Sequence, residues 1–190
     1  MRAAPRSTPI RRSAAMLLAA LATAPAPVAA FSSGSGTCVA SAQTAAPMGI
    51  ASPGSGGYSL QLQGPAGVPL NRYIPGQPAT LTISGTTPFK GLLLYAEDAQ
   101  GTRMGGFTSF NLLNYRLLAE CGGADDSTLT HQSALLKPPP QDVTWRAPDT
   151  DAGTLTFRAI VLRGFNDYYI LQSAPVTVFQ DAVFRNGFEP

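Results

Sequence analysis

Side chains that build catalytic and metal centres are scarce in this chain of 190 residues. It contains one histidine, two cysteines and one tryptophan, and 13% of its residues are charged. A blue-copper site takes two histidines with a cysteine, and catalytic zinc usually takes two or three histidines, so this chain cannot assemble either site alone. Residues 52–57 (SPGSGG) look like a protease serine motif, but the acidic residue is missing and His131 follows the serine. We predict no catalytic residue, no metal and no cofactor.

Long apolar runs are absent outside the start of the chain. Arginines precede an apolar run at 14–22, and residues 28–30 (VAA) offer a cleavage site, which predicts a removed signal peptide over residues 1–30. That run is far shorter than the ~20 residues that cross a bilayer, so we predict no membrane span. The predicted location is secreted, periplasmic or on the cell surface.

Positive charge is scarce once the leader is removed. Four of the thirteen basic residues lie in 1–30, which leaves nine basic and eleven acidic residues, a net charge of −2, for 31–190. No cluster of basic residues remains to displace counterions from a phosphate backbone. We therefore predict no nucleic-acid partner.

The two cysteines permit one intramolecular pairing, and an exported chain meets an oxidising compartment. We predict a disulfide between Cys38 and Cys121. It would tether the segment 31–57, which is rich in Ser, Gly, Ala, Thr and Pro and which we expect to be irregular.

Short β-rich runs separated by turn residues fill the rest of the chain. They predict an all-β fold, an immunoglobulin-like antiparallel β-sandwich of about seven to nine strands over residues 58–179. The candidate strands are 58–63, 79–84, 91–97, 106–108, 116–120, 128–131, 142–145, 155–162, 167–171 and 175–179.

Alternation of apolar and polar residues assigns faces to these strands. Within 155–161, the apolar residues Leu155, Phe157, Ala159 and Val161 share one face, which we expect to form core. Trp145 alternates with polar neighbours and is also predicted to be core. Strand 91–97 is apolar on both faces, which is typical of a central strand or of one whose second face is covered by a loop.

Five motifs occur in a fixed order: Tyr73–Gln77 (YIPGQ), Phe89–Leu94 (FKGLLL), Cys121, Leu129–His131 (LTH) and Trp145–Pro148 (WRAP). In this order they resemble the Reeler domain, the N-terminal module of reelin, which also occurs in insect defence proteins and ahead of some ferric-chelate reductases. The resemblance covers about residues 38–178. It implies an immunoglobulin-like, non-catalytic domain used for binding or matrix association.

The chain departs from the family pattern in two places. Leu92 stands where the family often has an aromatic residue, and residues 46–50 (APMGI) replace a segment that commonly contains a histidine. The tail, residues 180–190, lies beyond the domain. Its Phe184–Glu189 stretch resembles the ending of many exported proteins of Gram-negative bacteria, which suggests a stand-alone bacterial secreted member, with a docked or frayed terminus as the alternative.

Acidic residues cluster at predicted turns, where Asp caps its own backbone. Turn formation is therefore the expected role of Glu97-Asp98, Asp125-Asp126 and the pair Asp149 and Asp151, with a weak calcium site at the last pair as the alternative. His131 is expected to be structural, with its ring hydrogen-bonded to backbone at a strand end; a ligand contact or pH-sensitive surface is the alternative.

Aromatic residues in or beside turns are common anchors for ligands. The candidate binding residues are Arg163, Phe165, Tyr168, Tyr169, Tyr115 and His131. Together these features predict a secreted binding or adhesion module for an extracellular or envelope ligand, a glycan or a protein. The alternatives are a carbohydrate-active accessory enzyme that uses surface carboxylates, and a self-associating envelope or defence protein.

Overall fold

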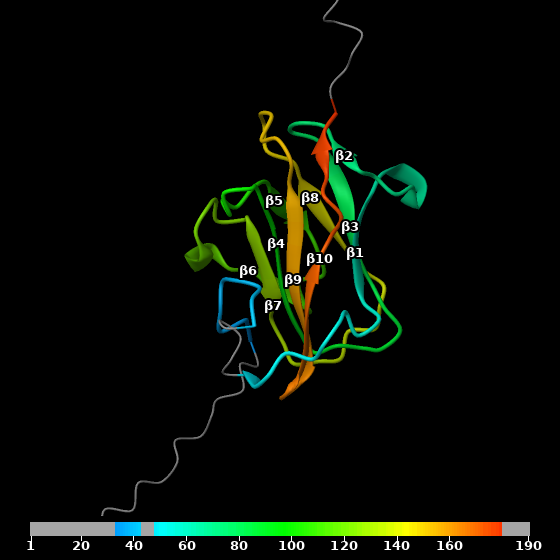
Figure 1. The fold of residues 1–190 in the computed structure, drawn as a ribbon, viewed down its shortest axis with the longest axis vertical. Helices are drawn as coiled ribbons and strands as arrows, with labels where there is room; N and C mark the ends of the chain where they lie inside the picture. Colours follow the sequence, from blue (N-terminus) through cyan, green and yellow to red (C-terminus); the bar gives the residue numbers. More distant parts are fainter. Residues whose placement is uncertain (1–32, 43–47, 180–190) are drawn as a thin grey trace, which may run out of the picture.

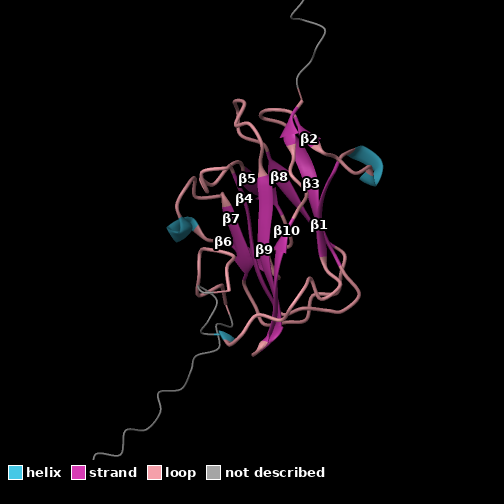
Figure 2. Ribbon diagram, viewed as in Figure 1, coloured by secondary structure: helices cyan, strands magenta, loops and turns pink. Residues whose placement is uncertain are grey.

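The computed structural model describes residues 33–42 and 48–179, so the predicted signal peptide and the tail 180–190 lie outside the described residues. Two antiparallel sheets pack face to face, as predicted (Figures 1 and 2). One sheet has the order β1 (Ser59–Gln63), β3 (Pro78–Ser84), β8 (Gln141–Arg146), β5 (Gly106–Ser109). The other has the order β10 (Asp167–Gln172), β9 (Thr156–Gly164), β4 (Gly91–Glu97), β7 (Thr128–His131), β6 (Tyr115–Leu117).

A small parallel pair raises the number of strands above the predicted seven to nine, and one of its two strands lies within the candidate strand 175–179. β2 (Arg72–Tyr73), which the sequence did not indicate, pairs with β11 (Thr177–Val178) at the upper end of the molecule in Figure 1. Two short 3₁₀ helices, η2 (Pro65–Gly67) and η3 (Ala119–Cys121), lie in loops. None of the helices in the described part of the chain has the length and apolar character needed to span a membrane.

The core between the sheets follows the predicted alternation. Leu155, Phe157, Ala159 and Val161 are all buried. Trp145 is buried as well and meets the Phe157 ring edge to face at 5.0 Å between centroids, while its indole N–H donates to the Met104 carbonyl at 3.2 Å. A buried indole needs such an acceptor, and here a loop carbonyl supplies it.

The five-stranded sheet also buries residues on its outer face. Leu93 and Tyr95 of β4 form a second apolar cluster with Ile160 and Tyr168. The described part of the segment before β1 covers this cluster, and the Ala40 backbone N–H donates to the Tyr95 hydroxyl at 2.9 Å. The central strand is therefore apolar on both faces because a loop covers the second one, as the sequence predicted.

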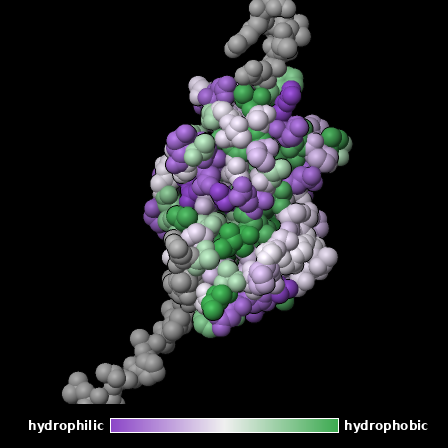
Figure 3. Space-filling model, viewed as in Figure 1, coloured by the Kyte–Doolittle hydropathy of each residue, from purple (hydrophilic) through white to green (hydrophobic). Residues whose placement is uncertain are grey.

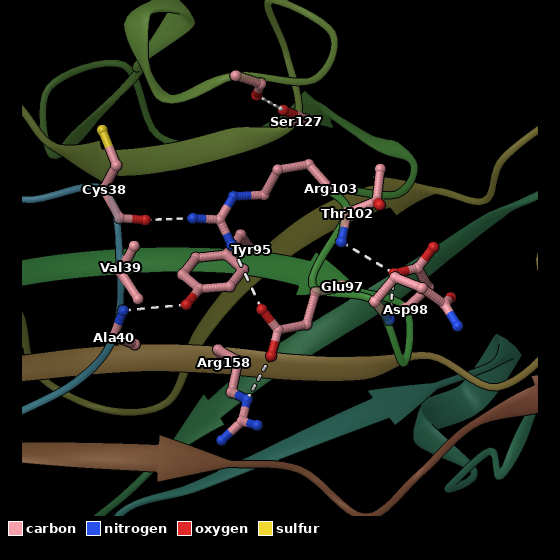
Figure 4. A network of polar contacts seen from close by, with 12 residues as sticks. Cys38, Val39, Ala40, Tyr95, Glu97, Asp98, Thr102, Arg103, Ser127 and Arg158 are labelled. Carbon is pink, nitrogen blue, oxygen red and sulfur yellow. Dashed lines mark hydrogen bonds and ion pairs between the residues drawn. The ribbon is translucent and has the colours of Figure 1, made fainter.

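The predicted disulfide is present and fixes this covering segment. Cys38 and Cys121 are joined, with an S–S distance of 2.08 Å. Next to it the Arg103 guanidinium lies on the Tyr95 ring, donates to the Cys38 carbonyl and pairs with Glu97 at 3.7 Å (Figure 4). One covalent bond and one buried cation thus hold the segment against the sheet.

Candidate functional site

Loops from both sheets meet at one end of the sandwich. β4 starts there, and its antiparallel neighbours β9 and β7 end there, while β6 and β10 start at the same end. In the other sheet β3 ends at this end and β1 and β8 start at it. The tip of the β9–β10 hairpin marks it at the bottom of Figure 1. We call it the loop end, and its loops are residues 48–58, 85–90, 110–114, 132–140 and 163–167.

All six predicted binding residues lie at or beside the loop end, in two groups. Arg163, Phe165, Tyr168 and Tyr169 belong to the β9–β10 hairpin. The other two, at the start of β6 and the end of β7, face each other in register as Tyr115 and His131. The fold therefore gathers residues that are more than fifty positions apart in the sequence at one end of the domain.

Arg163 anchors the hairpin corner. Its guanidinium donates two hydrogen bonds to the Asp167 carboxylate, at 2.9 and 2.8 Å, and one to the Tyr169 hydroxyl at 2.6 Å. The hydrogen bonds from Arg163 lower the pKa of Asp167 and raise the pKa of Arg163 itself. A bidentate pair of this kind fixes the orientation of the guanidinium. The Phe165 side chain, 64% exposed, stands at the tip of the hairpin beside this corner.

Four of the six candidate binding residues have buried side chains and do not lie at the surface. Tyr168 lies under residues 48–52, because its hydroxyl donates to the Gly49 carbonyl at 3.1 Å. Tyr169 packs against Tyr58, with 5.9 Å between ring centroids. Tyr115 donates to the Gln141 side chain at 3.0 Å, and burial raises the pKa of its hydroxyl.

The His131 ring is also buried, at the end of β7. Its Nδ1 lies 3.2 Å from both the amide nitrogen and the carbonyl oxygen of Leu92. This contact with the backbone is the structural role predicted from the sequence. Of the six candidates, Phe165 and the partly exposed Arg163 are therefore the ones placed to meet a ligand at the surface.

Lys137 is a residue of the loop end that sequence reasoning missed. Its side chain is buried, and its ammonium group donates to three backbone carbonyls, those of Lys90 and Ser133 at 2.7 Å and that of Leu135 at 2.9 Å. Burial lowers the pKa of Lys137 to about 8. The run LLKPPP at 135–140 gave no periodic signal for burial, because the acceptors are backbone atoms brought together by the fold.

The loop end also exposes large apolar side chains that the sequence analysis did not single out. They are Ile50 (85% exposed), Leu112 (70%), Leu113 (76%), Leu135 (65%) and Leu136 (61%), in addition to Phe165. Isolated exposed leucines are ordinary on a protein surface, but six such side chains at one end form a candidate interaction surface.

The loops at the other end of the sandwich are acidic, and two of their carboxylates accept hydrogen bonds from nearby backbone amides. Asp98 accepts from the amides of Gln100 and Thr102 at 2.9 and 2.8 Å, as expected for turn formation. At the alternative calcium site, Asp151 accepts from the Gly153 amide at 2.8 Å. Within residues 33–42 and 48–179, no group of three or more His, Cys, Asp or Glu side chains is arranged to hold a metal ion.

Two surface cavities lie away from the loop end. One of about 480 Å³ runs along the four-stranded sheet beside η2 and is lined by Gln63, Thr80, Asp142 and Thr144 among others. The second, of about 230 Å³, lies at the acidic end, between Asp126 and Arg146. Neither contains a predicted binding residue.

Comparison with known proteins gives a family match over more than half of the chain. The family model of the Reeler domain matches residues 62–183. Ferric-chelate reductase 1 of Bos taurus is 34% identical over 107 residues, which are 55% of this chain and 18% of that protein. This chain therefore spans less than a fifth of that relative.

Solved structures show the same fold at low sequence identity. A crystal structure of the human F-spondin reeler domain superposes with a TM-score of 0.56 and 18% identity, covering 70% of this chain and 95% of that one. A second structure, of the Reelin-N domain of F-spondin, gives a TM-score of 0.54 and 19% identity, covering 71% and 95%. Both superpositions cover almost the whole of the F-spondin domain.

Proposed function

Because this chain belongs to the Reeler domain family, we propose that it is an exported binding or adhesion module that performs no catalysis and recognises a ligand outside the cytoplasm through its loop end. Reeler domains are extracellular modules of the binding type. The observation that carries the proposal is the hairpin corner, where an exposed Phe165 stands beside an Arg163 whose orientation is fixed by two hydrogen bonds.

Preorganisation supports binding at this corner. A ligand that meets Arg163 does not have to order a long flexible side chain, because Asp167 and Tyr169 already hold it. The guanidinium also lies 4.9 Å from the centre of the Tyr169 ring, which supports it from one side. Aromatic side chains and arginines are common among the hot-spot residues that contribute most of the binding energy of an interface.

The placement of the acids argues against the accessory enzyme. Glycoside hydrolysis uses two carboxylates roughly 5 to 9.5 Å apart in one cleft. Here Asp98 caps its own turn, Asp149 pairs with Arg146 at 2.7 Å, and Asp167 pairs with Arg163. These carboxylates belong to separate turns and already accept hydrogen bonds from neighbouring groups.

A binding screen of the exported form against glycans and extracellular polymers tests the proposal. The informative variants are Phe165→Ser and Arg163→Ala, and Ile74→Ser is the matched control because it removes an exposed apolar side chain from the opposite end. We expect both hairpin variants to weaken binding and the control to bind like the native protein.

Three outcomes would contradict the proposal. Turnover of a polymer that is lost in His131→Ala would show catalysis. Equal effects of Ile74→Ser and Phe165→Ser on the ligand would show that recognition is not confined to the loop end. A protein that self-associates through the loop end would appear as a dimer in light scattering. That result would support the alternative of a self-associating envelope or defence protein.

A further inference from the structure

We propose that the loop end is a docking surface for a membrane with anionic lipid headgroups. This inference rests on the proposed function, because it names the ligand of the same end. Its components are the six exposed apolar side chains and a basic loop composition.

The first pair of leucines is held outward by an ordered turn. The Leu113 amide donates to the Asn111 side chain at 2.9 Å, and the amides of Asn114 and Tyr115 donate to the Asn111 carbonyl at 3.0 and 2.9 Å. Leu112 and Leu113 therefore project into water from a hydrogen-bonded backbone, so their exposure is part of the folded structure.

The second pair, Leu135 and Leu136, lies on a loop that the buried ammonium of Lys137 holds in place. The ammonium donates hydrogen bonds to the Ser133 and Leu135 carbonyls, which fixes the backbone that carries both leucines. The Ser133 hydroxyl donates to the Leu113 carbonyl at 3.3 Å, which joins this loop to the first one. Four leucines thus belong to one continuous, fixed surface.

The strand order extends this surface along the end of the five-stranded sheet. β4 lies between β9 and β7, so Lys90, which precedes β4, lies between the hairpin with Phe165 and the loop with Leu135. Ile50 joins the hairpin side, because the Asn166 amide donates to the Met48 carbonyl at 2.9 Å. In Figure 3 hydrophobic surface lies over the middle of β9 and β10, and a smaller hydrophobic patch lies near the lower end of the molecule.

Charge favours an anionic partner at this end. The five loops of the loop end contain three basic residues and a single acid, Asp167, which is paired with Arg163. Lys137 is buried and Arg163 is partly exposed, so Lys90 is the exposed basic side chain of these loops. The loops at the opposite end, residues 74–77, 98–105, 118–127 and 147–155, contain six acids and one basic residue. An anionic membrane would attract the first end and repel the second, which orients the domain as it approaches.

The form of the surface favours lipid over a folded protein partner. The apolar side chains stand on the tips of separate loops, and the two described cavities are lined by other parts of the molecule. Protruding aliphatic and aromatic side chains beside basic ones are typical of proteins that insert into the boundary between headgroups and acyl chains. A fluid bilayer adapts to such protrusions.

Cosedimentation of the exported form with vesicles tests the inference. One set of vesicles contains phosphatidylcholine alone, and the other contains phosphatidylcholine and phosphatidylglycerol in equal amounts. We expect binding to the second set that weakens with added salt, because the attraction between exposed charges is screened.

Variants at each part of the surface sharpen the test. The double change Leu112→Ser with Leu113→Ser should lower the partition coefficient on the order of tenfold, since two large apolar side chains no longer enter the interface. Lys90→Glu should lower it several-fold at low salt. Ile74→Ser, at the opposite end, should leave it unchanged, and unchanged circular dichroism shows that each variant is folded.

The possible results separate this inference from the proposed function. Absence of vesicle binding, or binding that the double serine variant does not weaken, overturns the inference. If Phe165→Ser still abolishes binding to a glycan or protein in the screen, the proposed function stands without it. A dimer that becomes a monomer in the double serine variant also overturns it, by assigning the leucines to an interface between copies.

Discussion

Replacement of Lys137 by methionine, which has a similar length and no charge, tests how the loop end is held together. Three hydrogen bonds from a charged donor are worth roughly 1.5 to 3 kcal/mol each. Burial lowers the pKa of the amine from 10.5 to about 8, which offsets this gain by about 3 kcal/mol at neutral pH. We therefore expect Lys137→Met to lose roughly 1.5 to 6 kcal/mol of the free energy of unfolding.

Urea denaturation, followed by the fluorescence of the single buried tryptophan, measures this loss. With a typical dependence of about 1 to 3 kcal/mol per molar urea, a loss of a few kcal/mol moves the midpoint by roughly 1 M or more. Lys90→Met is the matched control, because the Lys90 side chain is exposed and only its backbone carbonyl accepts a hydrogen bond from Lys137. The substitution removes a lysine charge and keeps that carbonyl. The control should retain nearly the native midpoint.

The difference in unfolding free energy between the native protein and Lys137→Met should depend on pH, and the direction of this dependence can be predicted. Between about pH 8 and pH 10.5 the unfolded chain binds the Lys137 proton more tightly than the folded one, so the native protein gains stability relative to Lys137→Met as pH rises. Below about pH 8 the difference is constant. An unchanged midpoint at pH 7, or a difference that shrinks as pH rises from 8 to 10, would refute the reasoning.

Three further perturbations have expected outcomes. Cys121→Ala opens a disulfide that spans 83 positions and should cost about 2 to 5 kcal/mol in chemical denaturation; a native midpoint would contradict its stabilising role. Trp145→Ala should cost about 3 to 5 kcal/mol by calorimetry, because it empties the centre of the core. Asp167→Asn should lose less thermal stability than the native protein as pH falls below about 4, measured as the melting temperature at each pH. The hydrogen bonds from Arg163 lower the pKa of Asp167, so its contribution is present above its unfolded pKa and is lost as pH falls through the folded one; equal acid profiles would disprove this.

Strands whose residues alternate, or which are bounded by turns, were predictable from the sequence. β4 and β7 begin and end where the pattern placed them, and the core face of β9 follows the alternation of apolar residues. β2 was not predictable, because it has two residues and obtains its partner, β11, from about a hundred positions further along the chain. Local pattern gives no information on such a pairing.

The candidate site was predictable in position and only partly in exposure. The sequence indicated aromatic residues near turns, and the fold brings them to one end, but Tyr168 is buried because residues 48–52 cover the outer face of its strand. Periodicity does not report such a cover. Lys137 was missed for the same reason, since three backbone carbonyls from two loops satisfy its charge. Conversely, Leu112 and Leu113 are apolar residues, which are usually buried, and they are exposed.

Hydrogen exchange of the exported protein, with and without vesicles that contain phosphatidylglycerol or a ligand found in the screen, tests the central claim most directly. We predict slower exchange at the loop end, in residues 48–58, 110–114, 132–137 and 163–167. Exchange at the acidic end, in residues 118–127 and 147–155, should not change. Protection confined to the acidic end, or to the four-stranded sheet beside η2, would contradict recognition through the loop end.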